Sequence, residues 1–178
     1  MSNIYGDISG VKEGDLFSKR KDLHHIGIHR PLQSGICGTA SNGGAESIVV
    51  SGGYEDDRDY GEEIIYIGHG GNKNGKQISD QVLTRGNLAL ATNVTSGNLV
   101  RVIRGANGDA AHSPADGYRY DGLYYVRDYG FKRGESGFQI IWFRLVKASY
   151  RERVSSSATT SSGQTTPGRR QTTISRII

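Results

Sequence analysis

Five stretches of the chain are rich in β-branched and aromatic residues and are separated by Gly, Asn and Asp. They cover residues 47–51, 63–68, 98–104, 122–131 and 138–146. This pattern predicts β-strands, and RGESG between the last two predicts a hairpin. One helix is predicted over residues 79–94, with Ser79 as its N-cap and Gly86 as an interruption. The pattern therefore indicates a mostly β, α+β domain: a curved sheet or open β-barrel with one or two flanking helices.

Length and composition narrow the class of protein. The 178 residues are enough for one domain with a hydrophobic core and a tail. Cys37 is the single cysteine, which excludes an intrachain disulfide or a cysteine-based zinc site and is typical of a reducing compartment. No apolar run approaches the roughly 20 residues of a membrane span, and no apolar signal segment opens the chain. We therefore expect a cytoplasmic protein without a membrane partner.

Charge is unevenly distributed along the chain, whose net charge is +4. Residues 147–178 carry six Lys and Arg against Glu152 alone, a net of +5, so residues 1–146 sum to −1. Residues 154–168, VSSSATTSSGQTTPG, are typical of a flexible linker, and RRQTTISRII after them suggests the first turn of another element. We predict a domain over residues 1–150, then a linker and the start of a further domain over 151–178.

The stretch VVSGGYEDDRDYGEEIIYIGHGG, residues 49–71, gathers six carboxylates around Arg58 in a basic protein. Its paired glycines allow close backbone approach to a flat object, and Tyr54 and Tyr66 could supply stacking faces. A carboxylate between them is suited to cytosine, because Asp or Glu accepts a hydrogen bond from the N4 amine. The alternative is an ordinary solvated acidic turn.

Other chemistry has weaker support in the sequence. Residues 70–77, GGNKNGKQ, match GxxxxGK, but Gln77 stands where Ser or Thr would bind magnesium, and no β-α-β pattern follows. A polar glycine-rich loop is the favoured interpretation, and a small nucleotide-binding enzyme is the competing one. The five histidines lack the paired spacing of metal ligands. We expect no catalytic residues, no metal and no cofactor.

Five segments together resemble the SRA domain, the SET- and RING-associated module that is also called YDG. They are YGDISGVKEGDLF (5–17), IGIHRPLQSGI (26–36), VVSGGYEDDRDYGE (49–62), SDQVLTRGNLALA (79–91) and the RYDG of 119–122. The resemblance implies an SRA, PUA-like fold and a reader of modified cytosine that flips the base out of double-stranded DNA. The modified base would be 5-methylcytosine, 5-hydroxymethylcytosine or both.

The resemblance also assigns roles in a base pocket. Tyr54 and Tyr66 would stack on the flipped base and Asp57 would read its amino edge. Backbone of Ser51, Gly52 and Gly53 would line the pocket. Ile67 stands where relatives commonly have threonine, so at this rim position a backbone contact would replace a hydroxyl contact. The remaining carboxylates, Asp56, Asp59, Glu62 and Glu63, are expected to face solvent or brace the turn.

Two loops of the family enter the vacated duplex. The corresponding residues are Leu32, Gln33 and Ser34, and Thr84, Arg85 and Gly86. Gln33 would fill the hole and bond the orphaned base, and Arg85 would bond guanine or phosphate; two ordinary surface loops are the alternative. His29 and Arg30 are expected to position the first loop and to meet the DNA backbone, Arg30 as a phosphate contact or as an internal brace. Leu32 and Gln33 differ from the His-Val pair of vertebrate relatives, which argues against a strict preference for hemimethylated CpG.

The tail suggests a biological context. Bacterial SRA domains of this type are often fused to a C-terminal HNH nuclease in modification-dependent restriction endonucleases. No HNH histidines or zinc cysteines follow residue 150, so we expect this chain to bind DNA without cutting it, in the bacterial cytoplasm and on the nucleoid. Homodimerisation through the missing domain is a further expectation. A chromatin-type methyl-CpG reader and a PUA-like RNA-binding barrel are the alternatives.

Overall fold

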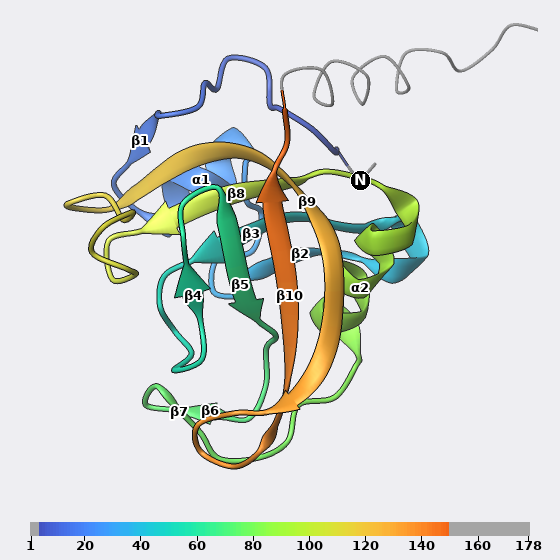
Figure 1. Ribbon diagram of the computed structural model, residues 1–178. Coiled ribbons are helices and arrows are strands. Elements are labelled where there is room, and N and C mark those ends of the chain that lie inside the picture. The colour runs from blue at the N-terminus through green and yellow to red at the C-terminus, as the bar shows by residue number, and fades with distance from the viewer. Residues whose placement is uncertain (1–3, 150–178) are drawn as a thin grey trace, which may run out of the picture.

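An eight-stranded sheet, left open on one side, organises residues 4–149, which are the residues that the computed structural model describes (Figure 1). Its strands follow the order β2-β3-β8-β9-β10-β5-β4, and β1 pairs with β9. The strands are β1 (Leu16–Phe17), β2 (Ile36–Thr39), β3 (Gly44–Val50), β4 (Arg58–Asp59), β5 (Glu63–Ile67), β8 (Val100–Gly105), β9 (Tyr118–Arg133) and β10 (Gln139–Lys147). Because β2 and β4 are both edges, a seam separates the two ends of the sheet.

The five predicted strands are confirmed as β3, β5, β8, β9 and β10, and so is the hairpin between β9 and β10. Every residue of β3 and of β8 is buried, and these two strands form the parallel pair of the sheet. Strands covered on both faces are typically apolar throughout rather than alternating. The open, curved, mostly β architecture predicted from the sequence is therefore present.

Two apolar clusters cover the two faces of the β3–β8 pair. The larger joins α2 (Arg85–Ser96) to the inner side of the sheet through Leu90, Val102, Phe143 and similar residues. The smaller joins α1 (Arg20–Ile26) to the other side through Leu23, Ile28 and Ile103. In the view of Figure 1, α2 lies to the right of the long strand β9.

The predicted start of the long helix is wrong. Residues 79–83 are not helical: the backbone N–H of Gln81 donates to the carbonyl of Gln139, which ties this segment to β10. Thr84 is the N-cap of α2. Gly86 does not interrupt the helix. A Cβ there would lie 3.1 Å from the Cβ of Ile36, so glycine lets the first turn approach β2.

Several short elements were not predicted. Helix α1 and strand β2 precede β3, and a 3-10 turn (Ala40–Asn42) connects β2 to β3. A separate hairpin, β6 (Asn72–Lys73) and β7 (Lys76–Gln77), follows β5. Asn74 and Gly75 at its tip both have positive φ, 52° and 82°, as a tight two-residue hairpin turn requires.

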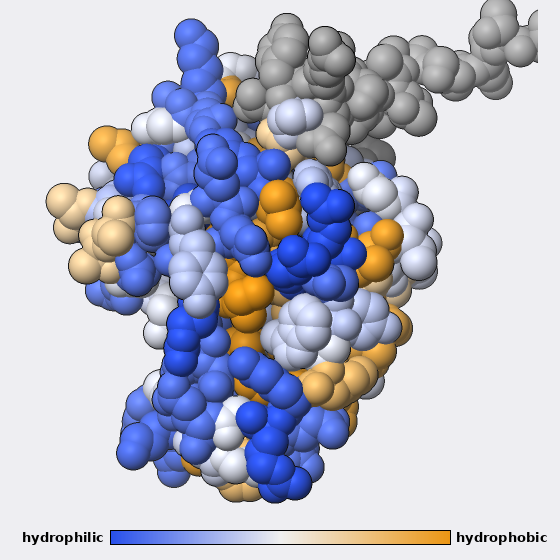
Figure 2. Space-filling view, viewed as in Figure 1, coloured by the Kyte–Doolittle hydropathy of each residue, from blue (hydrophilic) through white to orange (hydrophobic). Residues whose placement is uncertain are grey.

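Both ends of the described chain lie at the top of the view in Figure 1, whereas the β6–β7 hairpin and the turn between β3 and β4 lie lower. Figure 2 shows apolar surface over β5 and β10 between strongly hydrophilic ridges. No helix among residues 4–149 is long and apolar enough to cross a membrane.

Candidate functional site

The seam of the open sheet is bridged by residues 51–57, which connect β3 to β4 and which we call the acidic turn. One cavity of about 410 Å³ lies on the side of β2, β3 and β5. A second, of about 480 Å³, lies on the side of β4 and the loop after β8. Tyr54 and Asp57 line both cavities and so form the wall between them.

The first cavity, called the base cavity below, brings together most of the residues expected to read a base. Tyr54, Asp57, Tyr66, Ser51 and Gly53 all line it. The residues that complete its lining are Arg20, Gln33, Ser34, Gly35, Ile36, Val49, His69 and Gly70. Two aromatic rings, a carboxylate and backbone amides from separate segments therefore converge on one cavity, which falls within the roughly 300–1,000 Å³ of small-molecule sites.

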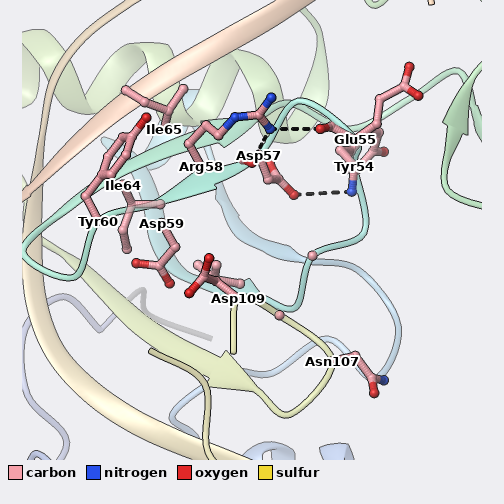
Figure 3. A pocket seen from close by; sticks show the side chains of 13 residues that line it. Tyr54, Glu55, Asp57, Arg58, Asp59, Tyr60, Ile64, Ile65, Asn107 and Asp109 are labelled. Carbon is pink, nitrogen blue, oxygen red and sulfur yellow. Dashed lines mark hydrogen bonds between the residues drawn. The ribbon is translucent and has the colours of Figure 1, made fainter. Parts of the chain in front are cut away.

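Asp57 is held by backbone donors from both sides of the seam. Its Oδ1 accepts from the N–H of Ile67 at 2.8 Å and its Oδ2 from the N–H of Tyr54 at 3.2 Å, the latter drawn in Figure 3. Burial raises the pKa of Asp57 to about 6, and the two N–H donors and neighbouring Arg58 oppose that rise. Each oxygen keeps lone-pair capacity for a further donor.

The two tyrosines are fixed by their hydroxyls. Tyr66 is 7% exposed, and its Oη donates to the carbonyl of Gly35 at 3.3 Å. A Cβ at position 35 would lie 2.7 Å from that hydroxyl, so glycine is what leaves it room. The hydroxyl of Tyr54 accepts from the N–H of Gly70 at 2.9 Å. Burial raises the pKa of both phenols, so both rings are neutral at physiological pH.

Two residues expected in this pocket take other places. Ile67 is 1% exposed, its side chain does not line the base cavity, and it contributes its N–H to Asp57. Successive residues of a strand point to opposite faces, so Tyr66 and Ile67 cannot both face the cavity. Gly52 lines the second cavity instead, with φ of 67° and with Asn107 close by.

The first expected loop lies at the mouth of the base cavity. Gln33 and Ser34 line the cavity, and Leu32 is 54% exposed. Arg20, which the sequence did not single out, donates to the carbonyls of Pro31 and Ser34 at 2.9 and 2.6 Å. The loop backbone is thus anchored from α1 while its tip stays exposed.

His29 is internal, whereas the side chain of Arg30 is 37% exposed. His29 is fully buried and bonds Ser47 Oγ at 2.7 Å and the carbonyl of Ser34 at 2.8 Å. The expectation that it meets the DNA backbone is therefore wrong, whereas its role in positioning the loop fits. Burial lowers the pKa of His29 to about 4, so it is neutral. Arg30 forms an ion pair with buried Glu46, which fits the expected brace, and the exposed part of its side chain leaves the phosphate contact as a prediction.

The second expected loop is mostly the start of a helix. Thr84 is the exposed N-cap, and Arg85 and Gly86 open α2. Arg85 is exposed, with a positive φ of 50°, so its side chain is available at the surface. Gly86 packs against Ile36, so it cannot enter a groove.

The other carboxylates of residues 55–62 divide into braces and exposed groups. Asp56 is 6% exposed and accepts from the N–H of Glu135 in the β9–β10 hairpin at 3.2 Å. Asp59 receives two bonds from Arg104, at 2.7 and 2.8 Å. Glu62 is exposed.

The YDG sequence, residues 120–122, supports this bracing. Asp121 accepts from Arg104 at 2.9 Å and from Arg119 at 2.6 Å. The Tyr120 hydroxyl donates to Asp7 at 2.6 Å. Arg104 therefore links Asp59, in the strand that follows the acidic turn, to β8 and β9. The motif acts as a brace, away from the base cavity.

The second cavity has a different chemistry. Figure 3 shows Asp59 and Asp109 near its centre, Tyr60 at one edge and Asn107 at the other. Asp59 is already paired with Arg104, and Asp109 accepts from the N–H of Ala111 at 2.9 Å. No group of three His, Cys, Asp or Glu among residues 4–149 is placed to hold a metal ion.

The phosphate-loop alternative fails on geometry. Its residues form the β6–β7 hairpin, and the next seven residues, 78–84, are not helical. A phosphate loop needs a helix N-terminus directly after it. The hairpin instead flanks the base cavity: the Asn72 side chain donates to the carbonyl of Gly53 at 2.7 Å, and Lys73 and Lys76 are exposed.

Six lining residues of the base cavity were not predicted as site residues: Arg20, Gly35, Ile36, Val49, His69 and Gly70. Arg20 belongs to a helix that was not predicted, and Gly35 directly follows the loop residues that were predicted to enter DNA. His69 and Gly70 directly follow β5. The glycine-rich GHGG after a strand is a signal that could have indicated a backbone-lined wall.

Comparison with known families gives one match over nearly the whole described chain. The profile of the family described as "SAD/SRA domain" matches residues 4–150. The "Histone-lysine N-methyltransferase family member SUVH2" of Arabidopsis thaliana is 44% identical over 152 residues, which cover 82% of this chain and 23% of that protein. The "E3 ubiquitin-protein ligase UHRF1" of Danio rerio is 40% identical over 174 residues, covering 85% and 22%. The chain thus spans about a fifth of the length of these relatives.

Solved structures agree with this match. A "Modification dependent TagI restriction endonuclease" superposes with a TM-score of 0.79 and 47% identity, covering 86% of this chain and 54% of that chain. The structure of "SUVH5 SRA bound to fully hydroxymethylated CG DNA" superposes with a TM-score of 0.71 and 42% identity, covering 82% and 95%.

Proposed function

Because the chain belongs to the SAD/SRA domain family, we propose that it binds modified cytosine in double-stranded DNA by turning the base out of the helix into the base cavity. The observation that carries the proposal is the convergence of Tyr54, Asp57 and Tyr66 on one cavity of about 410 Å³. The rings supply stacking faces, and Asp57 accepts from the N4 amine of cytosine.

The energy balance of flipping is close. Extrusion costs a few kcal/mol of unstacking and unpairing. Stacking on an aromatic side chain returns on the order of 1–3 kcal/mol per base. The amine contact to Asp57 selects cytosine over thymine, which presents an acceptor at that position. A 5-methyl group adds only about 0.8 kcal/mol when fully buried, so cavity shape must supply much of any preference over plain cytosine.

The elements around the cavity mouth suggest how the duplex is held. Gln33 lies on the anchored loop and is exposed beside the cavity, in reach of the space that the flipped base vacates. Lys73 and Lys76 on the β6–β7 hairpin and Arg85 at the start of α2 are exposed cations that suit phosphate or guanine. Since residues 1–146 net −1, such local cations rather than overall charge would attract DNA.

The biological setting follows from the relatives. Similarity to a modification-dependent restriction endonuclease, of which this chain covers 54%, favours the targeting half of such an enzyme. In that setting the chain binds without cutting, in the bacterial cytoplasm, and a further domain with the HNH chemistry supplies cleavage and dimerisation. The residues 151–178 that would lead into it lie outside the described part of the chain. A chromatin-type reader is the second candidate, favoured by the similarity to SUVH2 and UHRF1.

The test is binding to matched duplexes that bear cytosine, 5-methylcytosine or 5-hydroxymethylcytosine in hemi- and fully modified form. We expect tighter binding of at least one modified duplex and rising fluorescence from a 2-aminopurine beside the target base. Equal affinity for all duplexes without a fluorescence change would contradict the proposal. Cleavage of DNA by this chain in the presence of Mg²⁺ would contradict the proposal that it only binds DNA.

A further inference from the structure

The segment Gly68–Gly71, GHGG, forms one wall of the base cavity, and nearly all of its backbone polar groups are hydrogen-bonded. The N–H of Gly68 donates to the carbonyl of Ile141 at 2.8 Å, and the carbonyl of Gly71 accepts from the N–H of Ile78 at 2.6 Å. The remaining backbone polar groups of the segment, apart from the N–H of Gly71, are bonded by side chains. Such a wall is preorganised, because few of its backbone groups are left to find new partners on binding.

Three buried amide side chains hold this wall, and we call them the amide clamp: Gln77, Gln81 and Asn87. They are 3%, 1% and 1% exposed. Asn87 forms two hydrogen bonds with the backbone of His69. Its Oδ1 accepts from the His69 N–H at 2.8 Å, and its Nδ2 donates to the His69 carbonyl at 3.0 Å.

The two glutamines converge on the carbonyl of Gly70. Gln77 Nε2 donates to it at 2.8 Å, and Gln81 Nε2 donates to it at 3.2 Å and to the carbonyl of Gly68 at 2.5 Å. The same peptide segment presents the N–H of Gly70 to the Tyr54 hydroxyl at 2.9 Å. The clamp therefore holds the Gly70 N–H in place, and this N–H in turn holds the ring of Tyr54.

Each member of the clamp comes from a different part of the cavity mouth. Gln77 ends the β6–β7 hairpin, beside exposed Lys76. Asn87 lies in the first turn of α2, two residues after exposed Arg85. Gln81 joins the connecting segment to β10, since its Oε1 accepts from the N–H of Ile141 at 2.9 Å. A shift of the hairpin or of the start of α2 on binding DNA would therefore be transmitted to the cavity wall by a single side chain, Gln77 or Asn87.

We propose that the amide clamp positions the GHGG wall and Tyr54 for the flipped base, so that Gln77, Gln81 and Asn87 determine preference for modified cytosine without touching it. This inference rests on the proposed function. Buried amides that only stabilise the fold would instead affect binding of every duplex in proportion to the folded fraction.

Gln77 offers the cleanest test because, among residues 4–149, its side-chain amide bonds only the carbonyls of Gly70 and Ser79. Gln77→Met keeps the length of the side chain and removes both donors. We expect about fivefold to tenfold weaker binding of the modified duplex, the equivalent of about one net hydrogen bond, with nonspecific binding of unmodified duplex nearly unchanged. The matched control is Gln139→Met, because Gln139 is exposed and its side chain makes no hydrogen bond within residues 4–149.

A double-mutant cycle with Tyr54→Phe tests the route. Tyr54→Phe removes the acceptor of the Gly70 N–H, so Gln77→Met in that background should lose most of its effect on modified-duplex affinity. Additive losses would overturn the proposal, and so would an unchanged preference in Gln77→Met. Asn87→Ser, which releases His69, provides the second variant if Gln77→Met folds poorly. If wild-type protein itself shows no preference, the proposed function fails rather than the clamp.

Discussion

Replacing Asp57 is the most informative perturbation of the base cavity, because the same carboxylate holds the acidic turn and faces the proposed ligand. In the free protein Asp57→Ala deprives the N–H groups of Ile67 and Tyr54 of their acceptor. An unpaired buried donor costs about 1–3 kcal/mol. The substitution also removes the cost of burying a charged carboxylate, and this relief opposes the loss of stability. That cost is seen in the pKa of Asp57, which burial raises from 3.8 to about 6.

The sign and size of that relief follow from linkage. The folded-state pKa lies above the unfolded value, so ionised Asp57 lowers stability at pH values above about 6, and this cost disappears below about pH 4. Two pKa units correspond to at most about 3 kcal/mol at neutral pH. Two unpaired donors cost about 2–6 kcal/mol together, and the relief offsets at most about 3 kcal/mol of this loss. At neutral pH the free energy of unfolding of Asp57→Ala should therefore lie between about 1 kcal/mol above and about 6 kcal/mol below that of wild type.

The affinity for modified DNA should fall whichever way the stability of the variant changes. Without Asp57 the N4 amine of the flipped cytosine has no acceptor in the closed cavity, which should cost about 1–3 kcal/mol, or roughly 5- to 150-fold in affinity. Asp57→Asn should also lose discrimination between 5-methylcytosine and thymine at the target position, because its NH₂ can donate to thymine O4.

Fluorescence-anisotropy titrations with target 5-methylcytosine, thymine or an abasic site separate these effects, and urea unfolding reports stability. Glu62→Gln is the matched control, since it removes a charge from the same acidic stretch at an exposed position. Asp56 is unsuitable as a control because it is buried against the β9–β10 hairpin. If Asp57→Asn discriminates 5-methylcytosine from thymine as well as Glu62→Gln does, Asp57 does not read the amine.

Three further outcomes are expected. The affinity for modified duplex should be divided by the affinity for an abasic duplex, so that the titration of other groups cancels. This ratio should rise about tenfold from about pH 5 to about pH 7 as Asp57 ionises, and Asp57→Asn should show a flat profile. Gln33→Ala and Arg85→Ala should each cost about 1–3 kcal/mol on duplex DNA and less on single strands, and equal losses on both would indicate plain phosphate contacts. Residues 151–178 carry a net charge of +4, from five arginines and Glu152. Deleting them should weaken binding to all duplexes alike and reduce the salt dependence of binding. A deletion that removed selectivity alone would contradict this.

The strands were predictable because their burial follows directly from their composition. β3 and β8 contain runs of β-branched residues, although Glu46, Ser47, Arg101 and Arg104 interrupt them, and β10 alternates along most of its length. Helix α1 was missed for the complementary reason: of RKDLHHI only Leu23 is buried, so the segment has almost no amphipathic pattern. The start of α2 was placed too early because Ser79 is a plausible cap, while the competing backbone bond from Gln81 to β10 is nonlocal.

The acidic turn and both tyrosines were identified from the sequence, and the structure places them around one cavity. Their supports were not predictable. Arg104, buried between Asp59 and Asp121, reads as an ordinary strand residue. Gln77, Gln81 and Asn87 have no hydropathy signal that separates a buried amide from an exposed one. Polar residues that act by completing backbone hydrogen bonds become visible only when the backbone itself is known.

The placement of the two chain ends bears on how this domain is used in larger proteins. Ile4 and Ser149 border the described chain, and both ends lie away from the β6–β7 hairpin and the acidic turn (Figure 1). Neighbouring domains attached at either end can therefore differ in size and chemistry without obstructing the approach of a duplex. The same fold can therefore serve as a module in different multidomain proteins. Its relatives form part of a methyltransferase, a ubiquitin ligase and a restriction endonuclease, where the matching segment is 23%, 22% and 54% of the chain.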